Sequence, residues 1–278
     1  MKKRKYFSEI IREKSTVLVP GVFNAITARL MDQLKFQAIY LSGAGVSNAL
    51  LGKPDVGLIQ LSELVQQVSY ISAVTSLPLI VDADTGFGGP PQVEHCVRLL
   101  EAAGASAIQI EDQVSHKKCE HLEGKKLIPM KGMVSKIEAA VRGRRDKRTW
   151  IIARTDARGV GNLGEAIERS SNYAAAGADM VFPEALESRK DFAEFAKAVK
   201  IPLLANMTEF GKTPYFSIQE FRKMGYHCVI FPMTAFRLMM GSAETGLREL
   251  KRAGTQKRLL SKMQTRRELY RLINYHVS

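Results

Sequence analysis

The sequence predicts an α/β fold, a (β/α)8 barrel of the TIM type with additional helices at its C-terminal end. Three observations predict this class. Eight short apolar runs recur along the chain, segments with a helical pattern alternate with them, and no linker or low-complexity stretch divides the chain. The length of 278 residues, 45% of them hydrophobic, also suits one barrel domain, which typically has about 250 residues.

Each apolar run is nearly continuous, which is typical of parallel strands that are buried on both faces. The predicted strands are Val17–Val19, Ala38–Leu41, Leu77–Val81, Ala107–Ile110, Trp150–Ala153, Met180–Phe182, Leu203–Ala205 and Cys228–Phe231. The predicted helices between them are Ala25–Gln33, Leu61–Thr75, Pro91–Ala103, Lys131–Arg142, Leu163–Ala176, Ser188–Val199 and Ser217–Met224. We expect residues 1–278 to form a single barrel domain, with residues 235–278 as a C-terminal helical extension.

The charge balance is strongly basic, with 41 Lys and Arg residues against 28 Asp and Glu and a formal net charge of +13. The basic residues are scattered, so the sequence does not predict a nucleic-acid partner, but such a surface would attract an anionic small substrate. Three widely spaced cysteines predict no disulfide framework. No apolar run reaches the roughly 18 residues of a membrane span, so we expect no membrane partner and a cytoplasmic protein.

Polar residues follow most of the predicted strands. In a barrel of this kind the active site lies at the carboxyl ends of the strands, where these side chains would meet. They are Ser42 after the second strand, Asp82 and Asp84 after the third, Glu111 and Asp112 after the fourth, Arg154 after the fifth, Glu184 after the sixth, and Asn206 and Thr208 after the seventh. Their convergence predicts an active site at this mouth.

Asp82 and Asp84 are two residues apart, so their side chains share one face of a strand. Together with Glu111 or Asp112 on the neighbouring strand they suit a hard divalent cation, and Mg²⁺ commonly takes one or two carboxylates. The alternative is that one of the pair caps the next helix or pairs with a lysine.

Arg154 is suited to clamp a substrate carboxylate with two parallel hydrogen bonds, although a buried ion pair with Glu184 or Asp156 is the alternative. Asn206 and Thr208 lie on one face and are suited either to donate to a second carboxylate or to cap the loop.

The segment Lys117-Lys118-Cys119-Glu120-His121 places a thiol and an imidazole beside two cations, just after an acidic strand end. Such surroundings are typical of a thiol that acts as a proton donor or a nucleophile. Cys96 and Cys228 lie in apolar patterns instead and are predicted to be packing residues.

Several runs carry a family resemblance. The runs Tyr40-Leu-Ser-Gly, Val81-Asp-Ala-Asp-Thr-Gly-Phe-Gly, Ile110-Glu-Asp-Gln, Lys117-Lys-Cys-Glu-His and Ala153-Arg-Thr-Asp-Ala resemble the isocitrate lyase/phosphoenolpyruvate mutase superfamily. Phe182-Pro-Glu-Ala, Leu204-Ala-Asn-Met-Thr-Glu-Phe-Gly, Gly254-Thr-Gln and Met263-Gln-Thr-Arg-Arg-Glu-Leu-Tyr resemble the methylisocitrate lyase group within it. The similarity covers nearly the whole chain.

The resemblance implies a Mg²⁺-dependent carbon–carbon lyase that cleaves 2-methylisocitrate, a small anionic tricarboxylate, to pyruvate and succinate in the methylcitrate cycle of propionate catabolism. It also implies a homotetramer, a dimer of dimers, whose C-terminal helices are exchanged between subunits. Two alternatives stay open. One is another lyase of the superfamily, acting on dimethylmalate or oxaloacetate. The other is a catalytically weakened homologue that binds anionic metabolites.

The resemblance also implies residue roles. Asp82 and Asp84 would hold Mg²⁺, Cys119 would be the catalytic acid, and Asp55 matches a loop carboxylate that is important in the family. The matching substrate-binding positions are Ser42, Gly43, Ala44, Glu120, Arg154, Glu184, Asn206, Thr208, Arg237 and Arg266.

The reaction assigns roles to three further groups. Arg154 and His121 would stabilise developing negative charge. Tyr40 is the candidate base for the substrate hydroxyl, or else it packs under the loop. At position 120 the chain departs from the family, because Glu120 stands where glycine is usual.

Overall fold

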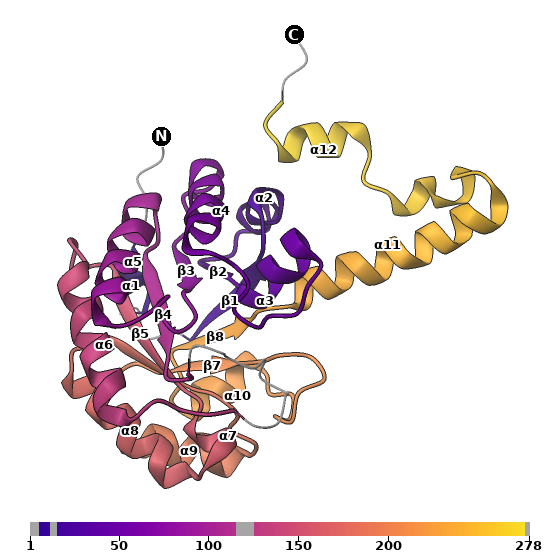
Figure 1. The fold of residues 1–278 in the computed structure, drawn as a ribbon. Coiled ribbons are helices and arrows are strands. Elements are labelled where there is room, and N and C mark those ends of the chain that lie inside the picture. Colours follow the sequence, from indigo (N-terminus) through magenta and orange to yellow (C-terminus); the bar gives the residue numbers. More distant parts are fainter. Residues whose placement is uncertain (1–5, 12–15, 115–124, 276–278) are drawn as a thin grey trace.

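The computed structural model describes residues 6–11, 16–114 and 125–275 of the chain. Within them, eight parallel strands form the centre of the molecule and helices surround the strands (Figure 1). The strands are β1 (Val17–Val22), β2 (Ile39–Leu41), β3 (Leu79–Asp82), β4 (Ala107–Glu111), β5 (Trp150–Thr155), β6 (Met180–Pro183), β7 (Leu204–Asn206) and β8 (Cys228–Phe231). Each of them overlaps a predicted strand, and the predicted fold class is confirmed.

The strands pair in the order β6-β5-β4-β3-β2-β1-β8-β7, and neighbouring strands in this order are parallel. A single parallel bridge between Val181 and Leu203 joins the two ends of this order, so the sheet closes into a barrel. Closure brings the carboxyl ends of all the strands to one mouth, which is the condition for a shared site.

The seven predicted helices all appear, with ends shifted by one residue at most. They are α2 (Ala25–Gln33), α4 (Leu61–Val74), α5 (Pro90–Ala103), α6 (Met130–Gly143), α8 (Leu163–Ala175), α9 (Arg189–Ala198) and α10 (Ile218–Lys223). Four short elements were not predicted, because one turn is too short to show a helical period. These are α1 (Phe7–Ile11), α3 (Gly43–Val46), the π-helix η1 (Ser47–Leu51) and α7 (Ala157–Val160).

Alternation along the strands separates two sets of side chains. Tyr40 and Ile80 point into the barrel and pack with Ile152 and Phe182, whereas their strand neighbours pack outward against the helices. At the amino end of the barrel, Phe7 of α1 meets Trp150 edge-on, with ring centroids 5.7 Å apart. The lower barrel is therefore filled with apolar side chains, and polar side chains are left for the mouth.

After β8 the chain leaves the barrel. α11 (Thr234–Ala253) extends away from it. After the 3₁₀ helix η2 (Lys257–Lys262) the chain turns back, and α12 (Arg266–Leu272) contacts α2 (Figure 1). These three helices are called the arm. None of the residues of α11, which is described throughout, is buried. In the part of the chain that the structure covers, no helix has the length and apolar character needed to cross a membrane.

Candidate active site

Two aspartates stand at the end of β3. Asp82 is the last residue of the strand, and Asp84 follows in the left-handed backbone region with φ 51°. Asp82 Oδ1 accepts hydrogen bonds from the Asp84 amide at 3.1 Å and from Gln109 Nε2 at 3.2 Å. The Gly43 amide lies 3.4 Å from Asp82 Oδ2 and donates to it. The orientation of this carboxylate is therefore set by three donors.

Gly43 is the point on which the two carboxylates converge. A Cβ built on this glycine would lie 3.1 Å from Asp82 Oδ2 and 3.4 Å from Asp84 Oδ1. The space between the backbone and the two aspartates is thus kept by the absence of a side chain. Two hard oxygen donors around such a space fit Mg²⁺, which fills its remaining positions with water and substrate oxygens.

The described residues contain no group of three or more His, Cys, Asp or Glu side chains arranged to hold a metal. A cation held here would consequently be bound by the Asp82 and Asp84 pair with open positions, and not by a closed protein cage. Open positions are typical of catalytic sites, because substrate must reach the ion.

Tyr40, the predicted base, lies below this pair and is buried. Its hydroxyl donates to Gln109 Oε1 at 2.9 Å, and the amide of Gln109 in turn donates to Asp82. Gln109 was not predicted as a functional residue. The period-two alternation of β4, which places Gln109 and Glu111 on the inward face, was the signal that could have found it.

Arg154 is held by three carboxylates. Its Nε lies 2.9 Å from Asp156 Oδ2 and its Nη2 lies 3.1 Å from Asp156 Oδ1. Glu111 Oε2 lies 3.4 Å from Nε and Glu184 Oε2 lies 3.5 Å from Nη2. The buried ion pair is therefore present. A guanidinium presents its N–H donors in a planar fork, which is also the geometry that suits a substrate carboxylate.

Lys125 completes this cluster from the other side, with its Nζ 2.5 Å from Asp156 Oδ1 and its side chain 5% exposed. Burial by itself would raise the pKa of Asp156, but the neighbouring Arg154 and Lys125 cations lower that pKa to about 2. Asp156 therefore remains ionised. Asp156 was predicted only as a possible ion-pair partner of Arg154, and Lys125 was not predicted, because its partner Asp156 is 31 residues away in sequence.

A third cation, Lys136 of α6, donates from Nζ to the Thr85 carbonyl at 2.8 Å, just beyond the aspartate pair. Burial lowers the pKa of Lys136, and the Glu111 carboxylate opposes this shift. Among the described side chains around the mouth, five carboxylates thus face three cations. The set comprises Asp82, Asp84, Glu111, Asp156 and Glu184 with Arg154, Lys125 and Lys136.

Ser42 and Glu184 are fixed by the backbone around them. The Ser42 hydroxyl accepts from the Gly45 amide at 3.2 Å and so caps α3, which also contains Ala44. Glu184 Oε1 accepts from the Ala185 amide at 2.9 Å, and Asn206 Nδ2 lies 3.3 Å from Glu184 Oε2. The ends of β2, β6 and β7 are brought to the same mouth in this way.

Thr208 and Asp55 are half-buried. Thr208 follows β7, and Asp55 lies in the loop after η1. The Ser47 hydroxyl lies 3.1 and 3.0 Å from the carbonyls of Lys53 and Pro54, which precede Asp55. That loop is therefore attached to η1 just before its carboxylate.

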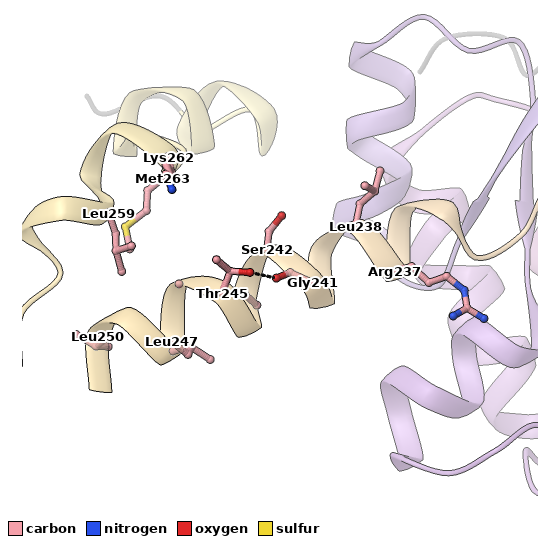
Figure 2. Close-up of a pocket in the computed structure, with 12 residues that line it drawn as sticks. Arg237, Leu238, Gly241, Ser242, Thr245, Leu247, Leu250, Leu259, Lys262 and Met263 are labelled. Atoms are coloured by element: carbon pink, nitrogen blue, oxygen red, sulfur yellow. Dashed lines mark hydrogen bonds between the residues drawn. The ribbon is translucent and has the colours of Figure 1, made fainter. Parts of the chain in front are cut away.

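The two predicted arginines of the C-terminal extension lie in different places. Arg237, in the first turns of α11, is half-exposed and points toward the barrel (Figure 2), where its Nε lies 3.5 Å from Glu209 Oε2. Arg266 begins α12, which follows η2 and contacts α2 on the outside of the barrel, and it is exposed. Within one chain, Arg266 is not brought to the mouth.

Cys119, Glu120 and His121 lie outside the described residues, as do Lys117 and Lys118. The described residues on either side of them pair with each other. The Val114 amide donates to the Lys126 carbonyl at 3.0 Å, and the Ile128 amide donates to the Asp112 carbonyl at 2.9 Å. The two described segments on either side of them therefore lie side by side at the end of β4.

The two described cysteines are buried, as predicted for packing residues. Burial, with a smaller contribution from the Asp84 charge, raises the pKa of the Cys96 thiol to about 12. Burial also raises the pKa of Cys228. Neither thiol is suited to proton transfer near neutral pH.

The fold and the acidic mouth correspond to a known class of barrel enzymes. The family model for phosphoenolpyruvate phosphomutase matches residues 7–251, and the chain therefore belongs to this family, part of the isocitrate lyase/phosphoenolpyruvate mutase superfamily.

Within the family, the chain is 56% identical over 268 residues to 2-methylisocitrate lyase of Aeropyrum pernix, covering 96% of this chain and 86% of that protein. A crystal structure of 2,3-dimethylmalate lyase is 34% identical with a TM-score of 0.90, covering 96% of this chain and 89% of that one. A phosphonopyruvate hydrolase in complex with oxalate and Mg²⁺ is 27% identical with a TM-score of 0.86, covering 95% of this chain and 92% of that one.

Proposed function

We propose that this protein cleaves 2-methylisocitrate to pyruvate and succinate, with Mg²⁺ held by Asp82 and Asp84. The observation that carries the proposal is the convergence of these carboxylates on Gly43 in the mouth that also contains Arg154. The 2-methylisocitrate lyase of Aeropyrum pernix, which is 56% identical, supports the substrate. The superfamily hydrolase whose complex contains Mg²⁺ supports the ion.

The reaction breaks the bond between C2 and C3 of the substrate. The C2 hydroxyl loses its proton and becomes the carbonyl of pyruvate, while the bonding electron pair passes to C3 and its carboxylate. A proton delivered to C3 then gives succinate. Bound Mg²⁺ would supply a Lewis acid that stabilises negative charge on substrate oxygens.

The chain's own residues bind the substrate and move the protons. Arg154 is proposed to bind a substrate carboxylate through its guanidinium, and Asn206 and Thr208 are proposed to donate to a second one. Tyr40 is the proposed base for the hydroxyl proton. It acts as the phenolate, so it must first give up the proton that its hydroxyl donates to Gln109 Oε1. Cys119 is the proposed donor to C3, because a thiol with an ordinary pKa of about 8.5 is protonated at neutral pH and still gives up its proton. His121 would stabilise the developing charge.

The test is an assay of pyruvate release from 2-methylisocitrate with Mg²⁺ and with EDTA. We expect turnover with Mg²⁺ and its loss with EDTA. Absence of pyruvate in the presence of Mg²⁺ would overturn the proposal. Oxaloacetate, dimethylmalate and phosphonopyruvate are assayed beside it to separate the other activities of the superfamily. Binding of these anions without any turnover would indicate a homologue that only binds metabolites.

Cleavage of 2,3-dimethylmalate is the second candidate. The solved 2,3-dimethylmalate lyase superposes on 96% of this chain with a TM-score of 0.90, so the same fold can serve that substrate. The ratio of kcat/KM for the two substrates decides between them, and a higher value for dimethylmalate would displace the leading proposal.

We further propose one barrel domain whose residues 235–278 form an arm that packs on a second copy of the chain, in a tetramer. The arm exposes Leu238 (66%), Leu247 (62%) and Leu260 (59%). A groove of about 760 Å³ lies between α11 and η2 and is lined by Leu247, Leu259 and Met263 (Figure 2). So much exposed apolar surface is typical of an interface. We place this assembly in the cytoplasm and propose no membrane or nucleic-acid partner.

Exchange of the arm between subunits would bring Arg266 to the active-site mouth of a neighbouring subunit. If α12 packs near the mouth of a neighbouring subunit, Arg266 contributes to that subunit's substrate site. Light scattering on the wild-type protein and on Leu247→Glu tests the assembly. We expect a tetramer for the wild type and smaller species for the variant, and a monomeric wild type would overturn this proposal.

A further inference from the structure

Asp112 is a buried carboxylate that the proposed chemistry does not use. It follows Glu111 at the end of β4 but turns away from the Asp82 and Asp84 pair. Its Oδ2 accepts from the Thr155 hydroxyl at 2.8 Å and from the Tyr173 hydroxyl at 2.8 Å, and its Oδ1 accepts from the Asp156 amide at 3.0 Å. The residue is fully buried.

The donors to Asp112 come from two directions. Thr155 and Asp156 belong to the end of β5, directly after Arg154. Tyr173 and Arg169 come from α8, which covers the outside of the barrel, and Arg169 Nη1 lies 3.4 Å from Asp112 Oδ2. Arg169 Nη1 also donates to the Ile128 carbonyl at 3.1 Å. Asp112 thus joins the helix layer to the strand end that carries the arginine clamp.

From Asp112 the contacts continue to Arg154 in one further step. The amide of Asp156 is held by Asp112, and the carboxylate of Asp156 takes both Nε and Nη2 of Arg154. Thr155, the residue between them, is held by the same Asp112 oxygen as Tyr173. The direction of the guanidinium is therefore set by Asp156, and the direction of Asp156 is set by Asp112.

An isolated strand end would not hold this arrangement. Beyond its last ladder bond a strand can rotate, and burying the Arg154 charge requires its partner to be fixed in place. Asp112 supplies the acceptors for one backbone amide and two hydroxyls, all buried, which would otherwise lose these hydrogen bonds.

We propose that Asp112 is a positioning residue for the lyase reaction, which holds the Thr155–Asp156 turn and through it the substrate-binding orientation of Arg154. This inference rests on the proposed function, because it assigns Arg154 to a substrate carboxylate. Asp112 itself touches neither the aspartate pair nor the substrate. Tyr173 supports it from α8.

The primary test is Asp112→Asn, which preserves shape but replaces one acceptor oxygen with a donor. We expect kcat/KM to fall about 10–100-fold, the scale of a clamp displaced by a fraction of an ångström to an ångström. Tyr173→Phe removes one donor to Asp112 with little change in volume and should produce a smaller loss in the same direction. It keeps the test decisive if Asp112→Asn folds poorly.

Asp179→Asn is the matched control. Asp179 is another part-buried aspartate, paired with Arg144 and accepting from the Ile151 amide at 2.8 Å, next to the amino ends of β5 and β6. We expect this variant to lower the thermal midpoint without changing kcat/KM. Equal kinetic losses in Asp112→Asn and Asp179→Asn would reduce Asp112 to a general stabilising role and overturn the proposal.

A double-mutant cycle shows whether Asp112 acts through Arg154. In an Arg154→Lys background, Asp112→Asn should cause little further loss of kcat/KM, because the guanidinium it positions is already gone. Losses that multiply in the double variant would overturn the proposal, as would wild-type kinetics in Asp112→Asn.

The same double-mutant cycle can be measured without turnover, by using calorimetry to determine the affinity of each variant for oxalate in the presence of Mg²⁺. Oxalate binding that weakens in Asp112→Asn, and weakens no further in the double variant, would support the positioning role. This holds even if no pyruvate forms from 2-methylisocitrate, because absence of pyruvate would count only against the proposed substrate.

Discussion

Replacing Asp156 with asparagine is predicted to destabilise the protein in a pH-dependent way. Asp156 is fully buried between Arg154 and Lys125, at 2.9 and 2.5 Å. The variant keeps the shape of the side chain but leaves two buried cations without their carboxylate. Removing one partner of a buried ion pair typically costs about 3–5 kcal/mol in the free energy of unfolding.

The sign of the pH dependence follows from the pKa of Asp156, which is about 2 in the folded protein against an ordinary value of 3.8. A depressed pKa stabilises the folded state at pH values above the unfolded pKa. That contribution is lost as the pH falls from about 4 toward 2. It amounts to about 2 kcal/mol at pH 7 and to about half of that at pH 3. The stability gap between wild type and Asp156→Asn should therefore narrow on acidification.

Urea unfolding at pH 7 and pH 3 measures this gap, with Asp179→Asn as the control. Burial raises the pKa of Asp179, so its ionisation opposes folding. The difference in free energy of unfolding between wild type and Asp179→Asn should therefore widen on acidification. A gap for Asp156→Asn that is as wide at pH 3 as at pH 7 would refute the assignment of Asp156 as an ionised partner of Arg154 and Lys125.

Three further predictions concern the reaction. Gly43→Ala puts a methyl group 3.1 Å from Asp82 Oδ2, so the Mg²⁺ concentration for half-maximal activity should rise about tenfold or more, and an unchanged requirement would contradict the metal assignment. Cys119→Ser should lower kcat at least about 10²-fold with oxalate affinity unchanged, because a hydroxyl is a far weaker acid, and near-normal turnover would remove Cys119 from its role. Glu120→Gly should preserve or raise kcat/KM, whereas a large loss would show that the glutamate has its own function.

The strands and most helices were predictable because their signals are local. The strand signal is an apolar run of a few residues, such as that of β4. A helix-end signal is a single glycine, such as Gly104, which has φ 117° at the end of α5. The short elements around the mouth were not predictable. α3 and η1 span four and five residues, and the contacts that stabilise them, such as the Gly43 amide with Asp82, join different strand ends.

The placement of Asp82 and Arg154 was also predictable, because a closed parallel barrel brings all its carboxyl strand ends together. Gln109 follows the alternation of β4 and was overlooked, since an amide inside a strand is chemically unremarkable until its neighbours are known. Asp156 and Lys125 follow no such rule, because they lie beyond the ends of the regular elements.

By itself, the sequence determined the barrel and many of the polar residues at its mouth, because apolar runs and helical patterns are properties of neighbouring residues. The tertiary structure decided which of two adjacent acids, Glu111 or Asp112, faces the mouth. It also decided that Asp156 holds Arg154 and that Arg266 lies away from the mouth of its own chain. The physical reason is distance along the chain. Past the end of a strand, the direction of a side chain is set by partners such as Tyr173, 61 residues from Asp112, that only the closed barrel brings within hydrogen-bonding reach.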